Sequence, residues 1–391
     1  MRYAINHYRQ KPTRWQNPDY EEYRNPEIIR VHQSIPEYQP TPLVGLTALA
    51  DKLGLGGIVV KDESQRFGLN AFKALGASYA VYRFLKQHES TQNIGLIRPE
   101  DFYRAPDFLP KGQITLCTAT DGNHGRAVAW TARKLRQRAV IYMPADSVEA
   151  RVNNIKSENA EVVLVEGSYD DAVLHCRRDA QQNGWHIISD TAWEGYGEIP
   201  NWIVAGYTTM FKEIDAVLND NRTISHVILP AGVGSFAASA VWYYNTVHTD
   251  RAIKLIIVEP ERAACLLWSL IENEGQPGQM PDLPQSIMAG LCCGTPSPGA
   301  WPLIREGADI FMTVEDSDAC AAMRLYAKPI GSDQRIISGE SGAAALAALM
   351  RICDSELMEK LGIDNRSIIL LFNTEGDTDP LNYQKIINSG D

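Results

Sequence analysis

The chain has little of what marks secreted, membrane-spanning or metal-binding proteins. It contains seven cysteines in 391 residues, which is too sparse for a fold held by disulfides, and their spacing matches no zinc site. No apolar run approaches the roughly 18–20 residues that a membrane span needs, and the first 15 residues lack the apolar core of a signal peptide. The sequence therefore predicts a cytoplasmic protein without a membrane partner or a metal.

Positive charge is also scarce. The net charge is −11, which argues against nucleic acid as a partner because nucleic acid selects basic surfaces. A small anionic ligand remains compatible with this charge, since a glycine loop can bind phosphate through backbone N–H groups. Hydrophobic residues make up 45% and charged residues 22%, and both values are typical of a soluble globular protein. The length indicates about two domains.

Apolar strands alternate with helical patterns along most of the chain, whereas the first 45 residues look irregular. Strands are expected at residues 57–61, 114–117, 139–143 and 161–165, and again at 227–229, 254–258, 309–314 and 368–372. Continuous apolar strands separated by helices indicate parallel sheets that are covered on both faces. The predicted fold class is therefore α/β, with two lobes that each contain a mostly parallel sheet flanked by helices.

Lys73 is the residue most suggestive of chemistry. It follows Asn70, which is expected to cap a helix, and apolar residues continue at helical spacing through Leu75 and Tyr79. A cation near the start of a helix opposes the helix dipole, and both that field and burial lower the pKa of a lysine. A lysine that is neutral part of the time suits imine chemistry. A solvated surface lysine is an equally good interpretation of this segment alone.

Two polar groups follow strands in the middle of the chain. The loop 118–125 includes Thr120, Asp121 and Asn123, and ligands of parallel sheets bind at this carboxyl edge. A polar turn that caps the next helix is the alternative, and His124 by itself is better explained as structural. Asp190 ends a further strand, where a carboxylate suits acid–base work, although capping or solvent exposure explains it equally well.

A glycine-rich loop follows the strand 227–229. Gly232, Val233, Gly234 and Ser235 open a helix, and such a loop binds anions through free N–H groups and the helix dipole. The same loop fits a dinucleotide pattern with Glu259 downstream, so a nicotinamide-dependent dehydrogenase is a rival interpretation. The position of the loop in the middle of the chain and its coexistence with Lys73 favour a single phosphate.

The last apolar strand, 368–372, precedes another polar loop. Thr374 begins this loop, and a hydroxyl at that position could meet the nitrogen of a heterocycle. A polar loop that ends at Pro380 without any ligand is an equally good interpretation of this segment.

Taken together, these segments resemble pyridoxal-phosphate enzymes of fold type II, the tryptophan-synthase β-like group, and within it the diaminopropionate ammonia-lyase family. The resemblance covers roughly residues 40–380 and rests on six segments in the same order, which are Phe67–Gly76, Asp121–Gly125, Ser168–Ala172, Asp190–Tyr196, Ala231–Gly234 and Thr374–Pro380. It implies a discontinuous, larger cofactor-binding domain of residues 1–85 and 210–391, a small α/β domain of residues 86–209, and a homodimer.

The resemblance also implies roles for individual residues. Lys73 would bind the aldehyde of pyridoxal 5'-phosphate covalently, with Phe72 packed near the pyridine ring and Asn123 bonded to the ring hydroxyl. The loop of Gly232, Val233, Gly234 and Ser235 would hold the phosphate. Thr374 would meet the ring nitrogen, and a neutral hydroxyl there suits β-elimination.

One departure from the wider group points to the substrate. Serine and threonine dehydratases generally have Ser-Gly-Asn-His where this chain has Asp121-Gly122-Asn123-His124. A carboxylate at this position can pair with the second amino group of 2,3-diaminopropionate, or it can exchange a proton at Cα. The implied activity is α,β-elimination of that amino acid to pyruvate and two ammonia, with Lys73, Asp121 and Asp190 catalytic and Thr120, Asp121 and Asp190 contacting substrate. A serine or threonine dehydratase is the alternative within the same fold group.

Overall fold

The computed structural model describes residues 1–10, 18–87, 98–120, 122–218 and 223–389. Contacts divide the chain into a first unit, made of Met1–Tyr20, Pro40–Gln65 and Met210–Asp391, and a second unit, made of Glu21–Gln39 and Arg66–Thr209. The resemblance placed residues 21–39 and 66–85 in the larger domain, but contacts group them with the second unit. Helix α3 (Lys73–Gln87) packs there against α4 (Asn123–Lys134) and α7 (Glu198–Gly206).

The first unit contains a seven-stranded sheet in the order β1-β10-β9-β8-β11-β3-β2. The five inner strands are parallel, and β1 and β2 are antiparallel edges. The inner strands are apolar and buried along most of their length, as expected for a sheet covered on both faces. The strands are β1 (Tyr3–Ile5), β2 (Leu43–Gly45), β3 (Gly57–Asp62), β8 (His226–Pro230), β9 (Lys254–Pro260), β10 (Ile310–Val314) and β11 (Ile368–Asn373).

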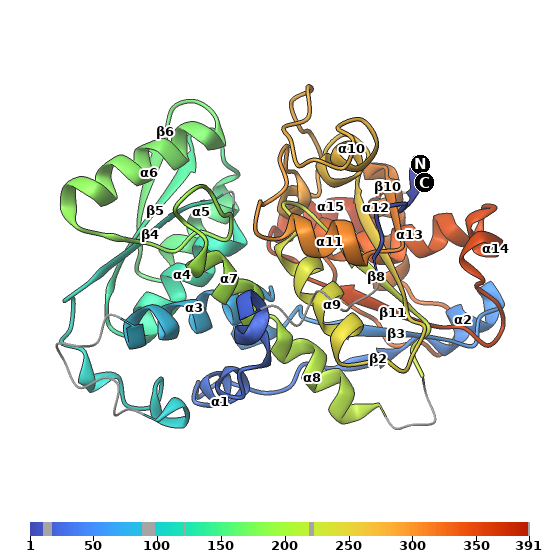
Figure 1. Cartoon of the computed structure of the whole chain (residues 1–391), viewed down its shortest axis with the longest axis horizontal. Helices are drawn as coiled ribbons and strands as arrows, with labels where there is room; N and C mark the ends of the chain where they lie inside the picture. The colour runs from blue at the N-terminus through green and yellow to red at the C-terminus, as the bar shows by residue number, and fades with distance from the viewer. Residues whose placement is uncertain (11–17, 88–97, 121, 219–222, 390–391) are drawn as a thin grey trace. The chain divides into compact units, whose positions relative to one another are not determined.

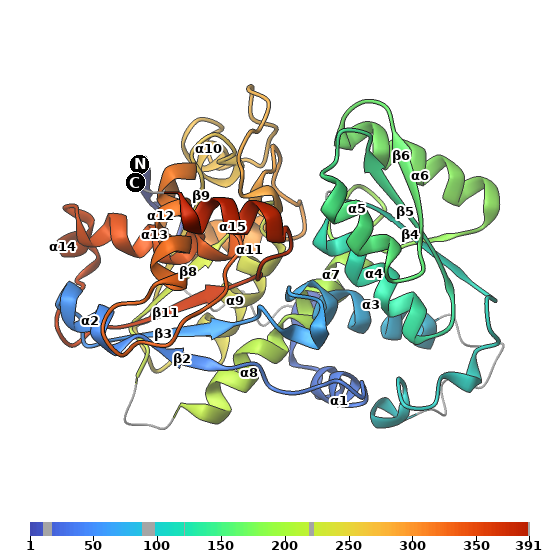
Figure 2. The same cartoon turned by 180° about the vertical axis from the view of Figure 1, so that it is seen from behind.

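Helices cover both faces of this sheet. The alanine-rich α13 (Glu340–Cys353) packs against β8, β9, β10 and β11, and small side chains permit that close approach. Helix α9 (Ser235–Thr246) lies in front of the sheet in Figure 1, whereas α15 (Pro380–Asn388) lies in front of it in Figure 2. The other helices of this unit are α2 (Thr47–Leu53), α8 (Thr208–Val217), α10 (Cys265–Ile271), α11 (Trp301–Gly307), α12 (Asp316–Ala327) and α14 (Leu357–Leu361).

The second unit contains a four-stranded, fully parallel sheet in the order β6-β5-β4-β7. One face packs on α6, where Ala172 and Cys176 meet Cys117 and Tyr142, and α4 contacts the other face. Alternation along the strands produces the two faces. The elements are β4 (Thr115–Ala119), β5 (Arg138–Pro144), β6 (Glu161–Val165), β7 (His186–Ile187), α1 (Glu27–Gln33), α5 (Glu149–Lys156) and α6 (Tyr169–Asn183).

The two parallel sheets confirm the predicted fold class, but the expectation that the first 45 residues are irregular is wrong. That segment holds β1, α1 and β2 within the described residues. Each is short, with three, seven and three residues, and α1 follows Pro26 without a side-chain cap. These elements are stabilised by partners far along the chain, such as β10 for β1, so the local sequence carries little sign of them.

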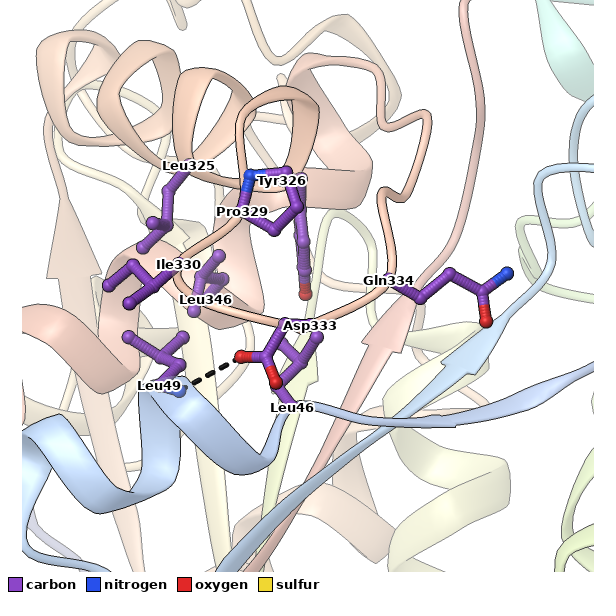
Figure 3. A pocket seen from close by; sticks show the side chains of 9 residues that line it. All are labelled: Leu46, Leu49, Leu325, Tyr326, Pro329, Ile330, Asp333, Gln334 and Leu346. Carbon is purple, nitrogen blue, oxygen red and sulfur yellow. Dashed lines mark hydrogen bonds between the residues drawn. The ribbon is translucent and has the colours of Figure 1, made fainter.

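A small cavity in the first unit is structural. Figure 3 shows it enclosed mainly by apolar side chains that include Leu46, Ile330 and Leu346, and its volume is about 10 Å³, which is enough for one water molecule. Asp333 lines it and accepts hydrogen bonds from the backbone nitrogens of Ala48 (2.8 Å) and Leu49 (2.9 Å). This carboxylate caps the start of α2, and the cavity is too small for a substrate.

Candidate functional site

Lys73 is the first residue of α3, and the segment before it is not the expected cap. Phe67, Gly68 and Asn70 all have positive φ, at 53°, 73° and 58°. Asparagine tolerates this left-handed conformation better than most residues, whereas Phe67 is a true exception. The chain therefore turns tightly just before Lys73, and Asn70 serves that turn. Backbone strain of this kind gathers at functional sites.

The amine of Lys73 meets a carboxylate of the same unit. Its Nζ donates to Oδ2 of Asp190 at 2.6 Å, and the two side chains are 19% and 12% exposed. Phe72 lies beside this pair, with the Lys73 nitrogen 5.6 Å from the centre of its ring. The ring of Tyr207 also packs against the ring of Phe72, at 4.8 Å between ring centres. The structure thus brings three predicted site residues together, namely Phe72, Lys73 and Asp190.

Electrostatics keep Asp190 ionised. Burial alone would raise the pKa of this carboxyl, but the charges of His124 and Lys73 outweigh it and hold the pKa well below its ordinary value. The same attraction stabilises the ammonium form of Lys73. The sequence predicted a helix field and burial that favour the neutral amine, but not the opposing carboxylate, which lies 117 residues away.

The loop between β4 and α4 is closed by its own threonine. The hydroxyl oxygen of Thr120 accepts from the backbone nitrogens of Gly122 (3.0 Å) and Gly125 (3.1 Å), and Thr120 is buried. Thr120, predicted to contact substrate, therefore shapes the loop in this structure. Asn123 is the first residue of α4, and Asp121 lies outside the described residues.

The glycine loop of the first unit has no room for side chains. At Gly234, φ is +101° and an added Cβ would lie 2.5 Å from Cδ1 of Ile304. At Gly232 it would lie 3.0 Å from Sγ of Cys293. Only glycine fits such positions without a shift, and this leaves the backbone bare.

Ser235 begins α9 directly after this loop, with no side-chain cap from Gly234. The carbonyl of Val233 accepts from the backbone nitrogen of Ser297 at 2.8 Å, and that of Gly232 lies 3.7 Å from Sγ of Cys265. The first N–H groups of a helix have no intrahelical partner and carry a positive partial charge. A narrow glycine cradle at the start of a 12-residue helix therefore fits a phosphate group.

The dinucleotide interpretation of this loop is not supported. Glu259 would have to bind a ribose, but its two carboxyl oxygens accept from the backbone nitrogens of Leu266 (2.7 Å) and Leu267 (2.8 Å). The side chain is fully buried, and burial raises its pKa to about 8 despite those two hydrogen bonds. Glu259 caps the start of α10 and is not available to a ligand.

Thr374 directly follows β11 and is 4% exposed. Its neighbours are held in place by hydrogen bonds within the first unit. Glu375 accepts from the backbone nitrogen of Ser341 at 3.1 Å, and Asn373 donates to Asp62 at 2.8 Å. The loop is therefore ordered around the one hydroxyl that was predicted to meet a heterocycle nitrogen.

Other kinds of site find no support in the part of the chain that the structure describes. No group of three or more histidine, cysteine, aspartate or glutamate side chains is arranged to hold a metal ion. None of the described helices is both long and apolar enough to cross a bilayer. No disulfide joins any of the seven cysteines, all of which lie within the described residues.

Comparison with known proteins agrees with this geometry. The family model for pyridoxal-phosphate dependent enzymes matches residues 35–373. Diaminopropionate ammonia-lyase of Escherichia coli (strain K12) is 41% identical over 368 residues, covering 92% of this chain and 90% of that protein. Biosynthetic L-threonine dehydratase of the same strain is 26% identical and covers 83% of this chain and 55% of that protein.

A solved structure of holo diaminopropionate ammonia-lyase from Escherichia coli superposes with a TM-score of 0.90 at 38% identity, covering 99% of this chain and 96% of that one. The fold is therefore that of fold type II enzymes, and the glycine cradle and Lys73 fit the cofactor that these enzymes carry. The chain belongs to the pyridoxal-phosphate-dependent enzymes and, among them, to the diaminopropionate ammonia-lyase family.

Proposed function

We propose that this chain converts 2,3-diaminopropionate and water to pyruvate and two molecules of ammonia, with pyridoxal 5'-phosphate as its cofactor. The observation that carries the proposal is the contact between Nζ of Lys73 and Oδ2 of Asp190 at 2.6 Å. Lys73 is the first residue of α3. When bound, the cofactor supplies an electron sink for the carbanion that forms when Cα loses its proton. The protein supplies attachment, orientation and proton transfer.

The proposed attachment uses the residues that the resemblance implies. Lys73 binds the cofactor's aldehyde, Phe72 packs beside its ring, and the loop from Gly232 through Gly234 to Ser235, including Val233, holds its phosphate. Asn123 bonds the ring hydroxyl and Thr374 the ring nitrogen. The bare cradle at Gly232 and Gly234 and the position of Phe72 next to Lys73 support these assignments.

The proposed proton transfers use Lys73 and the two carboxylates. With substrate bound, the Lys73 amine would remove the Cα proton from one stereoisomer. Asp121 serves the other stereoisomer and pairs with the β-amino group, which leaves as ammonia after protonation. The contact of Asp190 with the Lys73 amine supports a role for Asp190 as the partner of Lys73 more than as a base on the opposite face.

Dehydratase activity on serine or threonine is the second candidate. A structure of the Escherichia coli ammonia-lyase in complex with D-serine shows that this amino acid binds that protein. Asp121 favours diaminopropionate for this chain, because it matches a second amine that serine and threonine lack. The lower identity to the threonine dehydratase points the same way. We further propose that the enzyme acts in the cytoplasm as a homodimer.

An absorption spectrum of the purified protein tests the proposal directly. We expect a yellow protein whose visible band disappears on treatment with borohydride, with the reduced label mapped to the peptide that contains Lys73. Steady-state assays with diaminopropionate, serine and threonine then rank the substrates. A colourless protein that stays colourless with added pyridoxal 5'-phosphate would refute the cofactor assignment, and preferred turnover of serine would refute the substrate assignment.

A further inference from the structure

The strand that precedes Asp190 is too short to hold it in place. Strand β7 has two residues, His186 and Ile187, which pair with β4. The backbone nitrogen of Ile188 adds one more bond to the carbonyl of Cys117 at 2.9 Å, and strand pairing then ends. Asp190 lies two residues beyond this point, and side-chain contacts to the residues just before it help to set its position.

Tyr196 makes two of these contacts. Its hydroxyl donates to the carbonyl of Ile187 at 2.8 Å and accepts from the backbone nitrogen of Ser189 at 3.0 Å. One hydroxyl thus bridges the end of β7 and the residue next to Asp190. Hydrogen bonds on both sides of a short segment restrict its rotation more than a single bond does, because they fix two peptide planes.

The chain after Asp190 folds back to bring Tyr196 to this position. A tight turn at Gly195, where φ is +78°, pairs Trp193 with Tyr196 through two backbone hydrogen bonds of 3.2 and 2.9 Å. Their rings stack at 3.9 Å between centres with 7° between planes, and the guanidinium of Arg177 lies 4.9 Å from the centre of the Trp193 ring. The stack with Trp193 holds the Tyr196 ring in place, and this sets the position of the Tyr196 hydroxyl.

His124 makes the third contact. Its Nε2 lies 2.7 Å from the carbonyl of Ile188, and because a carbonyl can only accept, Nε2 carries the proton. Its Nδ1 is then 3.8 Å from Oδ2 of Asp190. The ring is buried, with 5% exposed. His124 therefore anchors the backbone just before Asp190 and faces the carboxylate from a different helix, α4.

We propose that Tyr196 and His124 are positioning residues that hold the carboxylate of Asp190 against the amine of Lys73. They act through the backbone from Ile187 to Ser189, which they hold from two directions. This inference rests on the proposed function for its consequence in catalysis, but its structural part concerns only the chain's own residues.

The first test uses the protein without cofactor. Tyr196→Phe removes the hydroxyl and keeps the ring that stacks on Trp193, so the fold is retained. We expect Asp190 to lose its fixed position and Lys73 to lose part of its ammonium stabilisation. Acetylation of Lys73 by acetic anhydride at pH 8, read by mass spectrometry, should then be at least about threefold faster than in the wild type, since half a unit of pKa is a factor of about three.

Two controls separate positioning from general loosening. Tyr103→Phe removes a buried hydroxyl that donates to the carbonyl of Ser78 at 2.7 Å in the same unit, and it should lower the melting temperature without changing the rate at Lys73. In an Asp190→Asn background, Tyr196→Phe should have no further effect on acetylation, because the group on which it acts is absent. An equal effect in both backgrounds, or no effect in either, overturns the proposal.

The role of His124 is tested with two substitutions, of which only one keeps an N–H donor. His124→Gln keeps a side-chain N–H that can reach the Ile188 carbonyl, whereas His124→Leu keeps none. We expect Lys73 to be acetylated faster in the leucine variant than in the glutamine variant, and equal rates would overturn the part of the proposal that concerns His124.

Turnover provides the last readout. In the holoenzyme, Tyr196→Phe should lower kcat for diaminopropionate by roughly tenfold with little change in KM, as expected for a small misplacement of a catalytic group. If the wild-type protein binds no pyridoxal phosphate, the proposed function is refuted. The acetylation rates then test the positioning role without it. A kcat equal to that of the wild type in Tyr196→Phe contradicts the positioning role even when the wild type is active.

Discussion

The side-chain nitrogen of Lys73 and Oδ2 of Asp190 are 2.6 Å apart, although 117 residues separate them in the sequence. Both side chains are largely shielded from water, with 19% and 12% exposed. A charge-assisted hydrogen bond with so little solvent access is stronger than a surface pair. The pair therefore controls both the charge of the lysine and its direction.

Asp190→Asn should keep the fold and lower kcat for diaminopropionate by about 100-fold, the lower end of what a positioned acid–base group contributes. The amide cannot balance the charge of Lys73 or exchange its proton. Steady-state kinetics check this, with Asp179→Asn as the control, because Asp179 accepts from Tyr142 at 2.8 Å in the same unit and lies outside the proposed site. An Asp190→Asn enzyme as fast as Asp179→Asn would contradict the role of this carboxylate.

Replacement of Asp121 should separate the two stereoisomers. We expect Asp121→Asn to lose most turnover of one isomer of diaminopropionate and to retain the isomer whose proton Lys73 removes. Asp121→Ser, which restores the residue of the dehydratases, should raise the ratio of serine to diaminopropionate in kcat/KM. Assays on the separated isomers are the measurement, and unchanged activity on both isomers would rule out Asp121 as a base.

Gly234→Ala should weaken cofactor binding by more than tenfold. The new methyl group would lie 2.5 Å from Ile304 at a φ of +101°, so the phosphate cradle has to shift. Gly362→Ala is the matched control, because Gly362 also has positive φ, +69°, but an added Cβ there meets nothing within 4 Å. That control should show only the conformational cost of about 1–2 kcal/mol, with normal cofactor affinity by titration.

A buried ion pair in the first unit should be costly to break. Nζ of Lys61 donates to Oε2 of Glu213 at 2.6 Å and to the carbonyl of Thr41 at 2.7 Å, and both charged side chains are almost fully buried. Lys61→Met removes the cation that this buried carboxylate contacts and should lower the free energy of unfolding by about 3–5 kcal/mol.

Urea denaturation measures this loss. The double variant Lys61→Met/Glu213→Leu should regain much of it, because both charges of this pair are then absent. A double variant that is less stable than Lys61→Met by the full cost of a second substitution would show that the two charges are not coupled.

His226 should make stability depend on pH near neutrality. Burial lowers its pKa below the ordinary 6.5, so the unfolded chain takes up a proton before the folded one does. The stability that neutral His226 contributes is therefore complete above pH 6.5. It decreases as the pH falls through that value toward the pKa of the folded protein. Thermal melts at several pH values should show a smaller decrease from pH 7 to pH 5 for His226→Gln than for the wild type. Parallel curves for the two proteins would count against this origin.

The sequence predicted the inner strands and most long helices because their periodicity is local. The parallel strands of both sheets lie within a few residues of the expected ranges. Eight of the described helices, all of ten residues or fewer, were not foreseen, because short segments leave weak signals: α1, α2, α7, α8, α10, α11, α14 and α15. The fold class followed from the alternation, whereas strand order had to come from tertiary contacts.

The candidate site was foreseen as a set of loops but not as a network. Lys73, Asp190 and the glycine loop each follow a recognisable pattern, and the structure joins the first two. The hydroxyl of Tyr196 was not foreseen as a contact of the Asp190 segment, because nothing in the sequence reports that a two-residue strand needs side-chain support. A glycine between two aromatic residues just after a strand, as at Trp193–Tyr196, is the signal that could have found it.

The division of the chain has a consequence for its synthesis. The polypeptide passes from one unit to the other at residues 20, 39, 65 and 209 and ends in the first unit. A growing chain that leaves the ribosome from its N-terminus can therefore complete the second unit once residue 209 has emerged. The first unit cannot be completed until β8 to β11 are made, so the apolar strand β3 lacks its parallel neighbour β11 until the end of synthesis.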